Sequence, residues 1–191
     1  MLTRIVVIVV LALVALAVFI ATRPSEFTVS RSRTIAAPPD VVFACVNDFG
    51  RWPEWSPWEK LDPQMKRERS GAPAGTGAVY YWSGNKKVGE GRMTITDSRP
   101  PSSLTIRLEF IKPWTATNTT QFDLAPSGAG THVTWTMSGH NNFMAKAFCL
   151  FMDMDKMVGG DFDKGLAALD TATAAAAKAV APVPARPLSA A

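Results

Sequence analysis

The sequence predicts an α+β protein in which a curved antiparallel sheet of about seven strands packs against a long C-terminal helix. Apolar and polar residues alternate along several segments, which short turn sequences separate. This pattern is typical of antiparallel hairpins, and linkers of hairpin length exclude a parallel doubly wound sheet. After residue 140 the apolar residues instead recur every three or four positions, as in an amphipathic helix. That helix is the one large element available to cover the apolar face of the sheet.

The N-terminal segment is apolar without a break from Ile5 to Ala21, between Arg4 and Arg23. As a helix it would be about 25 Å long, near the lower limit for crossing a bilayer. A cleaved signal peptide is the alternative, although the run is longer than most signal-peptide cores. We expect residues 1–24 to be a retained single-pass membrane anchor, and the arginines that follow the run favour a cytoplasmic domain.

The folded domain is expected to begin with a strand over residues 26–36, where apolar and polar side chains alternate. A short helix over 39–47 should follow, because prolines open it and apolar residues recur at helical spacing. A further turn or two of helix over 48–55 leads into "RWPEWSPWEKLDP", residues 51–63. This segment holds half of the six tryptophans, and its prolines exclude a long helix or a central strand.

Further strands should follow in hairpin order, with the clearest alternation of apolar and polar residues at 104–110. They are expected over 64–70, 78–84, 88–100, 103–113, 115–126 and 131–139. One long helix should then start at a cap at Asn141 or Asn142, with Gly159–Gly160 as the candidate kink. It should end near Ala179, so that residues 180–191 form a disordered tail rich in alanine and proline.

Composition gives few signs of a cofactor, metal ion or nucleic-acid partner. The net charge is +4, with basic residues scattered along the chain, and His132 and His140 are the only histidines. A histidine-based metal site and a nucleic-acid interface are therefore not predicted, nor is any cofactor. Cys45 and Cys149 are expected to be buried, reduced thiols, since both lie in apolar helical contexts far apart in the sequence. The oligomeric state is left open.

One stretch carries a family resemblance. "RTIAAPPDVVFACVNDFGRWPEWSPWEKLDP" closely resembles the opening of the SRPBCC (START-like) superfamily, in particular its polyketide cyclase/dehydrase branch. "GEGRMTITDSRPPSSLTIRLEF" and "GDFDKGLAAL" are similar too, so the resemblance covers about residues 26–172. It implies a helix-grip fold, with a deep and mostly apolar cavity between the sheet and the terminal helix. Members bind, carry or act on very different apolar molecules, so the resemblance implies no single activity.

Strand alternation predicts which side chains would line that cavity. Asn118 and Thr120 share the inward parity of Phe122, and polar groups that face an apolar interior need a partner, water or a ligand. Alternatively, they lie at the solvated end of their strand. Trp55 and Trp58 either close the cavity or attach an irregular loop to the core. The predicted ligand-binding residues are Trp55, Trp58, Trp82, Met93, Leu108, Phe110, Asn118, Thr120, Trp135, Met137, Phe143 and Phe151. From the terminal helix, Phe143, Ala147, Leu150, Phe151 and Met154 should face the sheet.

These features predict a membrane-anchored domain that binds or transports a hydrophobic small molecule, such as a lipid or a polyketide-like compound. A polyketide cyclase or aromatase is the alternative, but it needs a general acid or base beside the substrate. Parity places Glu109 on the outer face, Glu90 is expected at the surface, and His140 is expected in the loop that caps the last helix. Glu59 is the remaining ionisable residue near the cavity, so no acid–base pair emerges. A non-catalytic regulatory or interaction domain is the second alternative.

Overall fold

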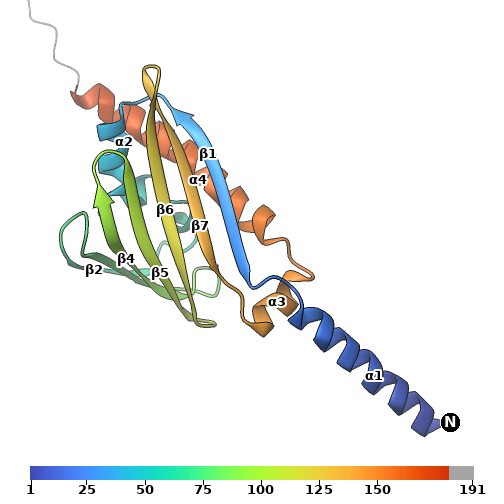
Figure 1. The fold of residues 1–191 in the computed structure, drawn as a ribbon. Coiled ribbons are helices and arrows are strands. Elements are labelled where there is room, and N and C mark those ends of the chain that lie inside the picture. The colour runs from blue at the N-terminus through green and yellow to red at the C-terminus, as the bar shows by residue number, and fades with distance from the viewer. Residues whose placement is uncertain (181–191) are drawn as a thin grey trace, which may run out of the picture.

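The computed structural model describes residues 1–180, with side chains as far as residue 175. Seven strands form one antiparallel sheet in the order β1-β7-β6-β5-β4-β3-β2 (Figure 1). The strands are β1 (Glu26–Ile35), β2 (Lys66–Gly71), β3 (Ala78–Ser83), β4 (Glu90–Arg99), β5 (Ser103–Lys112), β6 (Ala116–Ser127) and β7 (Gly130–His140). The helices are α1 (Leu2–Ala21), α2 (Pro39–Val46), α3 (Phe143–Cys149) and α4 (Met154–Val180), with 3-10 turns η1 (Trp52–Glu54) and η2 (Pro57–Lys60).

The predicted fold class is confirmed: a curved, open antiparallel sheet carries a long C-terminal helix on one face. We call the face towards α4 the inner face. Helix α4 runs beside β1 and contacts α2 and both 3-10 turns, whereas α1 projects away from the domain (Figure 1). The side chains of α1 are exposed apart from Ile20, and the helix is long and apolar enough to cross a membrane, a property that signal sequences share.

The prediction of one unbroken terminal helix is wrong, because two N-terminal caps start two helices. The Asn142 side chain accepts a hydrogen bond from the Ala145 amide at 2.9 Å and starts α3. The Asp153 carboxylate accepts one from the Lys156 amide at 3.1 Å, the third residue of α4, which is the geometry of a helix cap. The expected kink residues, Gly159–Gly160, lie inside α4. The described part of α4 reaches Val180, and the predicted tail lies outside the described residues.

Ion pairs hold α4 along the edge strand β1. The Arg31 guanidinium binds the Asp155 carboxylate at 2.8 Å and lies 3.4 Å from Asp163. It crosses α4 at Gly159, where a Cβ atom would lie 2.0 Å from an Arg31 nitrogen. Further along, the Asp170 carboxylate accepts a hydrogen bond from the Ala36 amide at 3.1 Å. These contacts fix the part of the inner face that α4 covers, which is the β1–β7 side.

Aromatic side chains fill the space between α4 and the sheet. Trp135 of β7 stacks on Phe162 of α4 with ring centroids 4.1 Å apart and planes 7° apart, and on Phe122 of β6 at 4.8 Å. Trp55 meets the Trp135 ring edge-on at 5.6 Å. Gly165 leaves room for this packing, because a Cβ atom there would lie 2.7 Å from Trp135 Cζ3. The expectation of a hollow along the terminal helix therefore does not hold in this half of the domain.

The tryptophan segment is attached to α2 by hydrogen bonds as well as by packing. The indole nitrogen of Trp52 donates to the Val46 carbonyl at 3.0 Å, and that of Trp55 donates to the Cys45 carbonyl at 3.3 Å. Buried indole N–H groups need such acceptors, so these two residues anchor an irregular loop to the core. Cys45 is buried and free, as expected, but Cys149 on α3 is only half-buried, contrary to expectation.

Candidate functional site

Exposure changes abruptly along the inner face of the sheet. Strand pairing places Ile95, Ile106 and Thr120 in one row across β4, β5 and β6, and all three are buried. The next row towards α1 contains Met93, Leu108 and Asn118. Met93 and Leu108 are only partly buried, although they point to the same face. The inner face of β4 and β5 is therefore fully covered at the first row and only partly covered at the second.

We call this region the inner-face patch and define it by the half-buried inward side chains at this end of the sheet, together with the buried Asn118 and Met137 that lie beside them. It consists of Phe27, Met93, Leu108, Phe110, Asn118 and Met137. Trp82 borders this patch. The Trp82 ring lies across Gly91, where a Cβ atom would be 2.3 Å from the ring. It also meets the Phe110 ring edge-on, with 6.1 Å between the ring centroids. The patch is thus apolar and walled by an aromatic side chain on its β3 side.

Asn118 is the polar group in the middle of this apolar surface. Its residue is 8% exposed, and its amide oxygen lies against Gly139, where a Cβ atom would be 2.1 Å away. Among the described residues, the Asn118 side chain makes one hydrogen bond: its Nδ2 donates to the Met137 sulfur at 3.8 Å. A thioether is a weak acceptor, so the Asn118 amide keeps most of its hydrogen-bonding capacity for another molecule.

A buried polar cluster lies on the β2–β3 side of the inner face. The Glu59 carboxylate of η2 accepts a hydrogen bond from Arg67 Nε at 2.7 Å through one oxygen and from the Tyr80 hydroxyl through the other. Burial and the bond to Glu59 raise the pKa of the Tyr80 hydroxyl above its ordinary value. The bond to Glu59 also raises the pKa of Arg67. Both oxygens of Glu59 are therefore engaged in tying η2 to β2 and β3.

The other ionisable residues considered as catalytic groups are Glu109, Glu90 and His140. Glu109 is on the outer face, as its parity predicted, where it binds Arg92 and Arg107 at 2.9 Å each. Glu90 binds Lys112 and the Tyr81 hydroxyl, and these bonds lower its pKa. His140, expected in a loop, is the last residue of β7.

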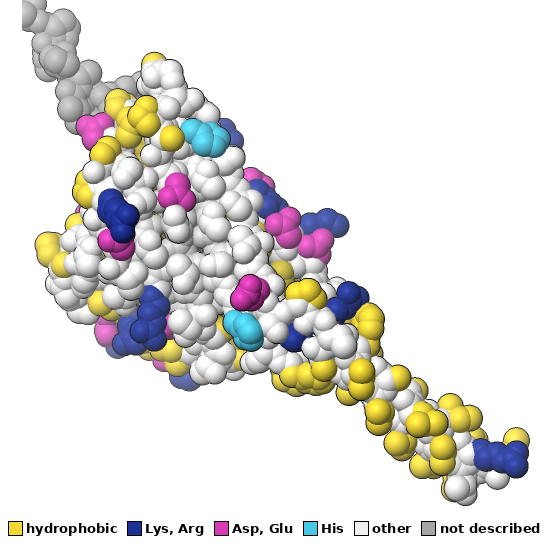
Figure 2. All heavy atoms as spheres, viewed as in Figure 1, with side chains coloured by type: hydrophobic (Ala, Val, Ile, Leu, Met, Phe, Trp, Pro, Cys, Tyr) yellow, Lys and Arg dark blue, Asp and Glu magenta, His cyan; other side chains and the backbone are white. Residues whose placement is uncertain are grey.

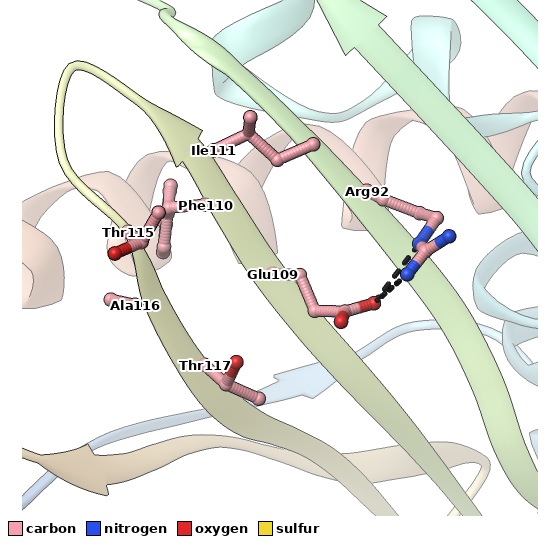
Figure 3. A pocket seen from close by; sticks show the side chains of 7 residues that line it. All are labelled: Arg92, Glu109, Phe110, Ile111, Thr115, Ala116 and Thr117. Carbon is pink, nitrogen blue, oxygen red and sulfur yellow. Dashed lines mark hydrogen bonds and ion pairs between the residues drawn. The ribbon is translucent and has the colours of Figure 1, made fainter.

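A hollow of about 450 Å³ lies beside Glu109 at the end of the β5–β6 hairpin. Figure 3 shows the Arg92–Glu109 ion pair that crosses it from β4 to β5. Strand register puts Arg92, Glu109 and Thr117 on the outer face, opposite to the inner-face patch. Phe110 of the patch also lines this hollow, but the hollow opens at the end of the hairpin and is crossed by the outer-face ion pair, so it is not the apolar site predicted between the sheet and the terminal helix.

The structure brings together seven of the predicted ligand residues and separates the other five. Trp82, Met93, Leu108, Phe110, Asn118, Thr120 and Met137 lie in or beside the inner-face patch. Trp55 and Trp135 are each 1% exposed within the filled core, and Trp58 packs edge-on against Phe162. The expectation that Phe143 and Phe151 face the sheet is wrong, because they are 48% and 87% exposed. The break before Asp153 turns their segment towards α1.

Two residues near the patch were missed by sequence reasoning. Phe27 pairs with Gly139 and so reaches the row of Asn118, which the register of β1 against β7 determines. Tyr80 pairs with Met93 and carries the hydroxyl that binds Glu59. Both have the parity of their buried neighbours in the sequence, so alternation within each strand is the signal that could have found them. In the described part of the chain, no group of three or more His, Cys, Asp or Glu side chains is placed to hold a metal ion.

An antiparallel sheet that holds a long C-terminal helix and presents a half-buried apolar surface beyond it defines a helix-grip domain. The chain belongs to the polyketide cyclase / dehydrase and lipid transport family, whose model matches residues 26–174. The resemblance seen in the sequence is thereby confirmed. A search among curated proteins finds no match.

Solved structures share this fold at low sequence identity. Mll3558 from Rhizobium loti is 24% identical, and the match covers 77% of this chain and 96% of that protein with a TM-score of 0.55. MLL2253 from Mesorhizobium loti is 18% identical, with 78% and 98% covered and a TM-score of 0.56. The Aha1 dimer from Colwellia psychrerythraea is 16% identical, with 77% and 96% covered and a TM-score of 0.56. At these identities the likeness shows a common fold alone.

Proposed function

We propose that this protein is a membrane-anchored domain that binds a hydrophobic small molecule, of lipid or polyketide-like character, on the inner-face patch. The observation that carries the proposal is the step in burial along the sheet. Ile95 and Ile106 are fully buried, whereas Met93 and Leu108, one row further, are partly open around the polar amide of Asn118. An apolar surface with one well-placed polar group is the usual composition of a small-molecule site.

The free energy gained by covering apolar surface favours a ligand with a long apolar part. Removing apolar surface from water contributes about 25 cal/mol per Å², so covering roughly 200 Å² would contribute about 5 kcal/mol before the costs of association. The Asn118 amide would then fix the orientation of the ligand through a carbonyl or hydroxyl group. The family description, which includes lipid transport, agrees with this class of ligand.

The anchor in this proposal is α1. Its 20 residues span about 30 Å as a helix, which equals the thickness of the hydrocarbon core of a bilayer. Its apolar side chains are exposed almost throughout, so the domain itself does not cover them. A helix of this kind would hold the domain at a membrane surface.

Cyclase chemistry is less well supported by the geometry. It would require an acid or base that can reach a ligand on the patch. Glu59 reaches the inner face, but Arg67 and Tyr80 already occupy both of its oxygens. The arrangement therefore favours binding over catalysis.

The proposal is tested by measuring ligand binding to the full chain in lipid nanodiscs. A dansyl-labelled fatty acid serves as the probe, and its emission is excited directly. Leu108→Trp fills the patch and should weaken binding about tenfold or more, because the ligand loses apolar contact area. Asn118→Leu should weaken binding about two- to tenfold, as expected for one lost hydrogen bond.

Thr119→Leu is the matched control, since Thr119 is the next residue of β6 and is exposed on the outer face. It should bind the probe as the unchanged protein does. Equal affinities for Leu108→Trp and Thr119→Leu would refute the patch as the binding site. Native mass spectrometry of the chain purified from its own cells would identify the bound molecule.

A further inference from the structure

Exposed apolar side chains outside α1 gather in two segments. Among the described residues that follow α1, every exposed large hydrophobic residue apart from Leu61 lies within 111–114 or 143–157. They are Ile111, Trp114, Phe143, Met144, Phe148, Phe151, Met152 and Met157. Figure 2 shows hydrophobic atoms continuing from α1 onto the adjoining end of the domain. A cluster of this kind on a soluble surface marks a protein or membrane interaction site.

The two segments meet each other and the end of α1. Trp114, in the loop between β5 and β6, lies 6.3 Å from the Phe148 ring of α3, measured between centroids. Helix α3 contacts α1, and the Lys146 ammonium donates a hydrogen bond to the Ala21 carbonyl at 3.3 Å. The apolar cluster is thus continuous with the point at which the apolar helix ends.

Positive charge lies at the same junction. A hollow of about 350 Å³ there is lined by Arg23, Pro24, Asn141, Lys146, Cys149 and Leu150. The Arg23 guanidinium lies 4.4 Å from the centroid of the Phe19 ring, and among the described residues no salt bridge of Arg23 or Lys146 is recorded. Cations next to the end of a membrane helix match the anionic phosphates of lipid headgroups. Trp114 matches the preference of tryptophan for the membrane–water interface.

We propose that α3 and the β5–β6 loop form a membrane-docking surface that lies in the interfacial layer of the bilayer crossed by α1. Trp114, Phe148 and Phe151 contact the acyl region, while Arg23 and Lys146 lie at the level of the phosphates. This inference rests on the proposed function in one respect, namely that α1 spans the bilayer.

The docking surface also specifies how the ligand reaches the inner-face patch. Phe110 is the last inward residue of β5 before the loop that carries Trp114, and Phe27 follows α1 by a few residues. The open end of the patch therefore faces the bilayer surface. An apolar molecule would move between membrane and patch without crossing bulk water, so the ligand class is a membrane lipid or a compound dissolved among lipids.

The test uses the full chain in vesicles of phosphatidylcholine and phosphatidylglycerol, in which part of the phosphatidylcholine carries bromine atoms near its headgroup end. Bromine quenches the fluorescence of tryptophans that it touches. Trp114 is 67% exposed, whereas the other five tryptophans are buried or half-buried in the domain. The unchanged chain should show a quenched component that Trp114→Phe loses. Trp58→Phe, the matched control within the domain, should retain it.

Phe151→Asp provides a second variant, because a side chain that is 87% exposed is not needed for folding. It should reduce quenching of Trp114 by placing a charge in the interfacial layer. Quenching that is unaffected by Trp114→Phe would overturn the inference. So would quenching that is absent at high protein-to-lipid ratio and appears only on dilution with lipid, since the cluster would then be covered by another copy of the chain.

Flotation of the vesicles separates the two proposals. If the chain floats with the vesicles but Trp114 is not quenched, the docking surface is refuted and the anchor stands. If the chain stays behind, the anchor is refuted and the docking surface with it.

Discussion

Substituting two glycines of α4 tests whether the helix packs on the sheet without spare room. An alanine Cβ at Gly165 would lie 2.7 Å from Trp135 Cζ3 and 3.2 Å from Pro57 Cδ, whereas at Gly160 no atom lies within 4 Å. Alanine in place of glycine favours a helix by about 1 kcal/mol. Gly160→Ala should therefore raise the free energy of unfolding by about that amount.

At Gly165 the same gain is opposed by overpacking, which costs about 1–3 kcal/mol in a filled core. The Trp135 ring cannot retreat easily, because Phe162 and Phe122 stack on it. Gly165→Ala should therefore be about 1–3 kcal/mol less stable than Gly160→Ala. In a domain of this size such a difference lowers the midpoint temperature by roughly 2–12 °C.

The assay is unfolding of the two variants by heat and by urea, followed by the near-ultraviolet circular dichroism of the tryptophans. If Gly165→Ala is as stabilising as Gly160→Ala, space remains beside Trp135. The hollow that the sequence predicted along the helix would then exist after all.

Three further predictions follow from the buried groups and from the contact between β1 and α4. Tyr80→Phe should destabilise the domain by about 1–3 kcal/mol, because a buried oxygen of Glu59 loses its donor. The folded state raises the pKa of Tyr80, so the stabilisation by its hydroxyl is fully present below the ordinary pKa of about 10 and declines as the pH rises above that value. Measuring the free energy of unfolding against pH for the unchanged protein and for Tyr80→Phe checks this. Burial raises the pKa of the Cys45 thiol, so a thiol reagent should modify half-buried Cys149 in the native chain and Cys45 only after unfolding. Arg31→Gln should speed amide hydrogen exchange in the first turns of α4, as measured by mass spectrometry, and unchanged exchange would contradict a fastening role for Arg31.

Local alternation was sufficient to predict the strands and the inward side chains. Leu108 and Asn118 face inward as their parity predicts, and Glu109 faces outward. Parity gives the face of a residue but not its depth, so Trp135 was placed among ligand residues although Phe162 covers it. The cap at Asp153 was visible in the sequence, but the apolar periodicity continues across it and suggested one helix.

The sequence by itself determined the fold class, the family and the face on which each strand residue lies, because alternation, turn residues and helical periodicity act between near neighbours. Only the tertiary structure decided which part of the inner face is filled and which is left half-open. That depends on where α4 starts and on the register that brings Trp135 under Phe162, contacts between residues far apart in the chain. The same holds for the apolar cluster at α3, which is exposed because its segment turns away from the sheet towards α1.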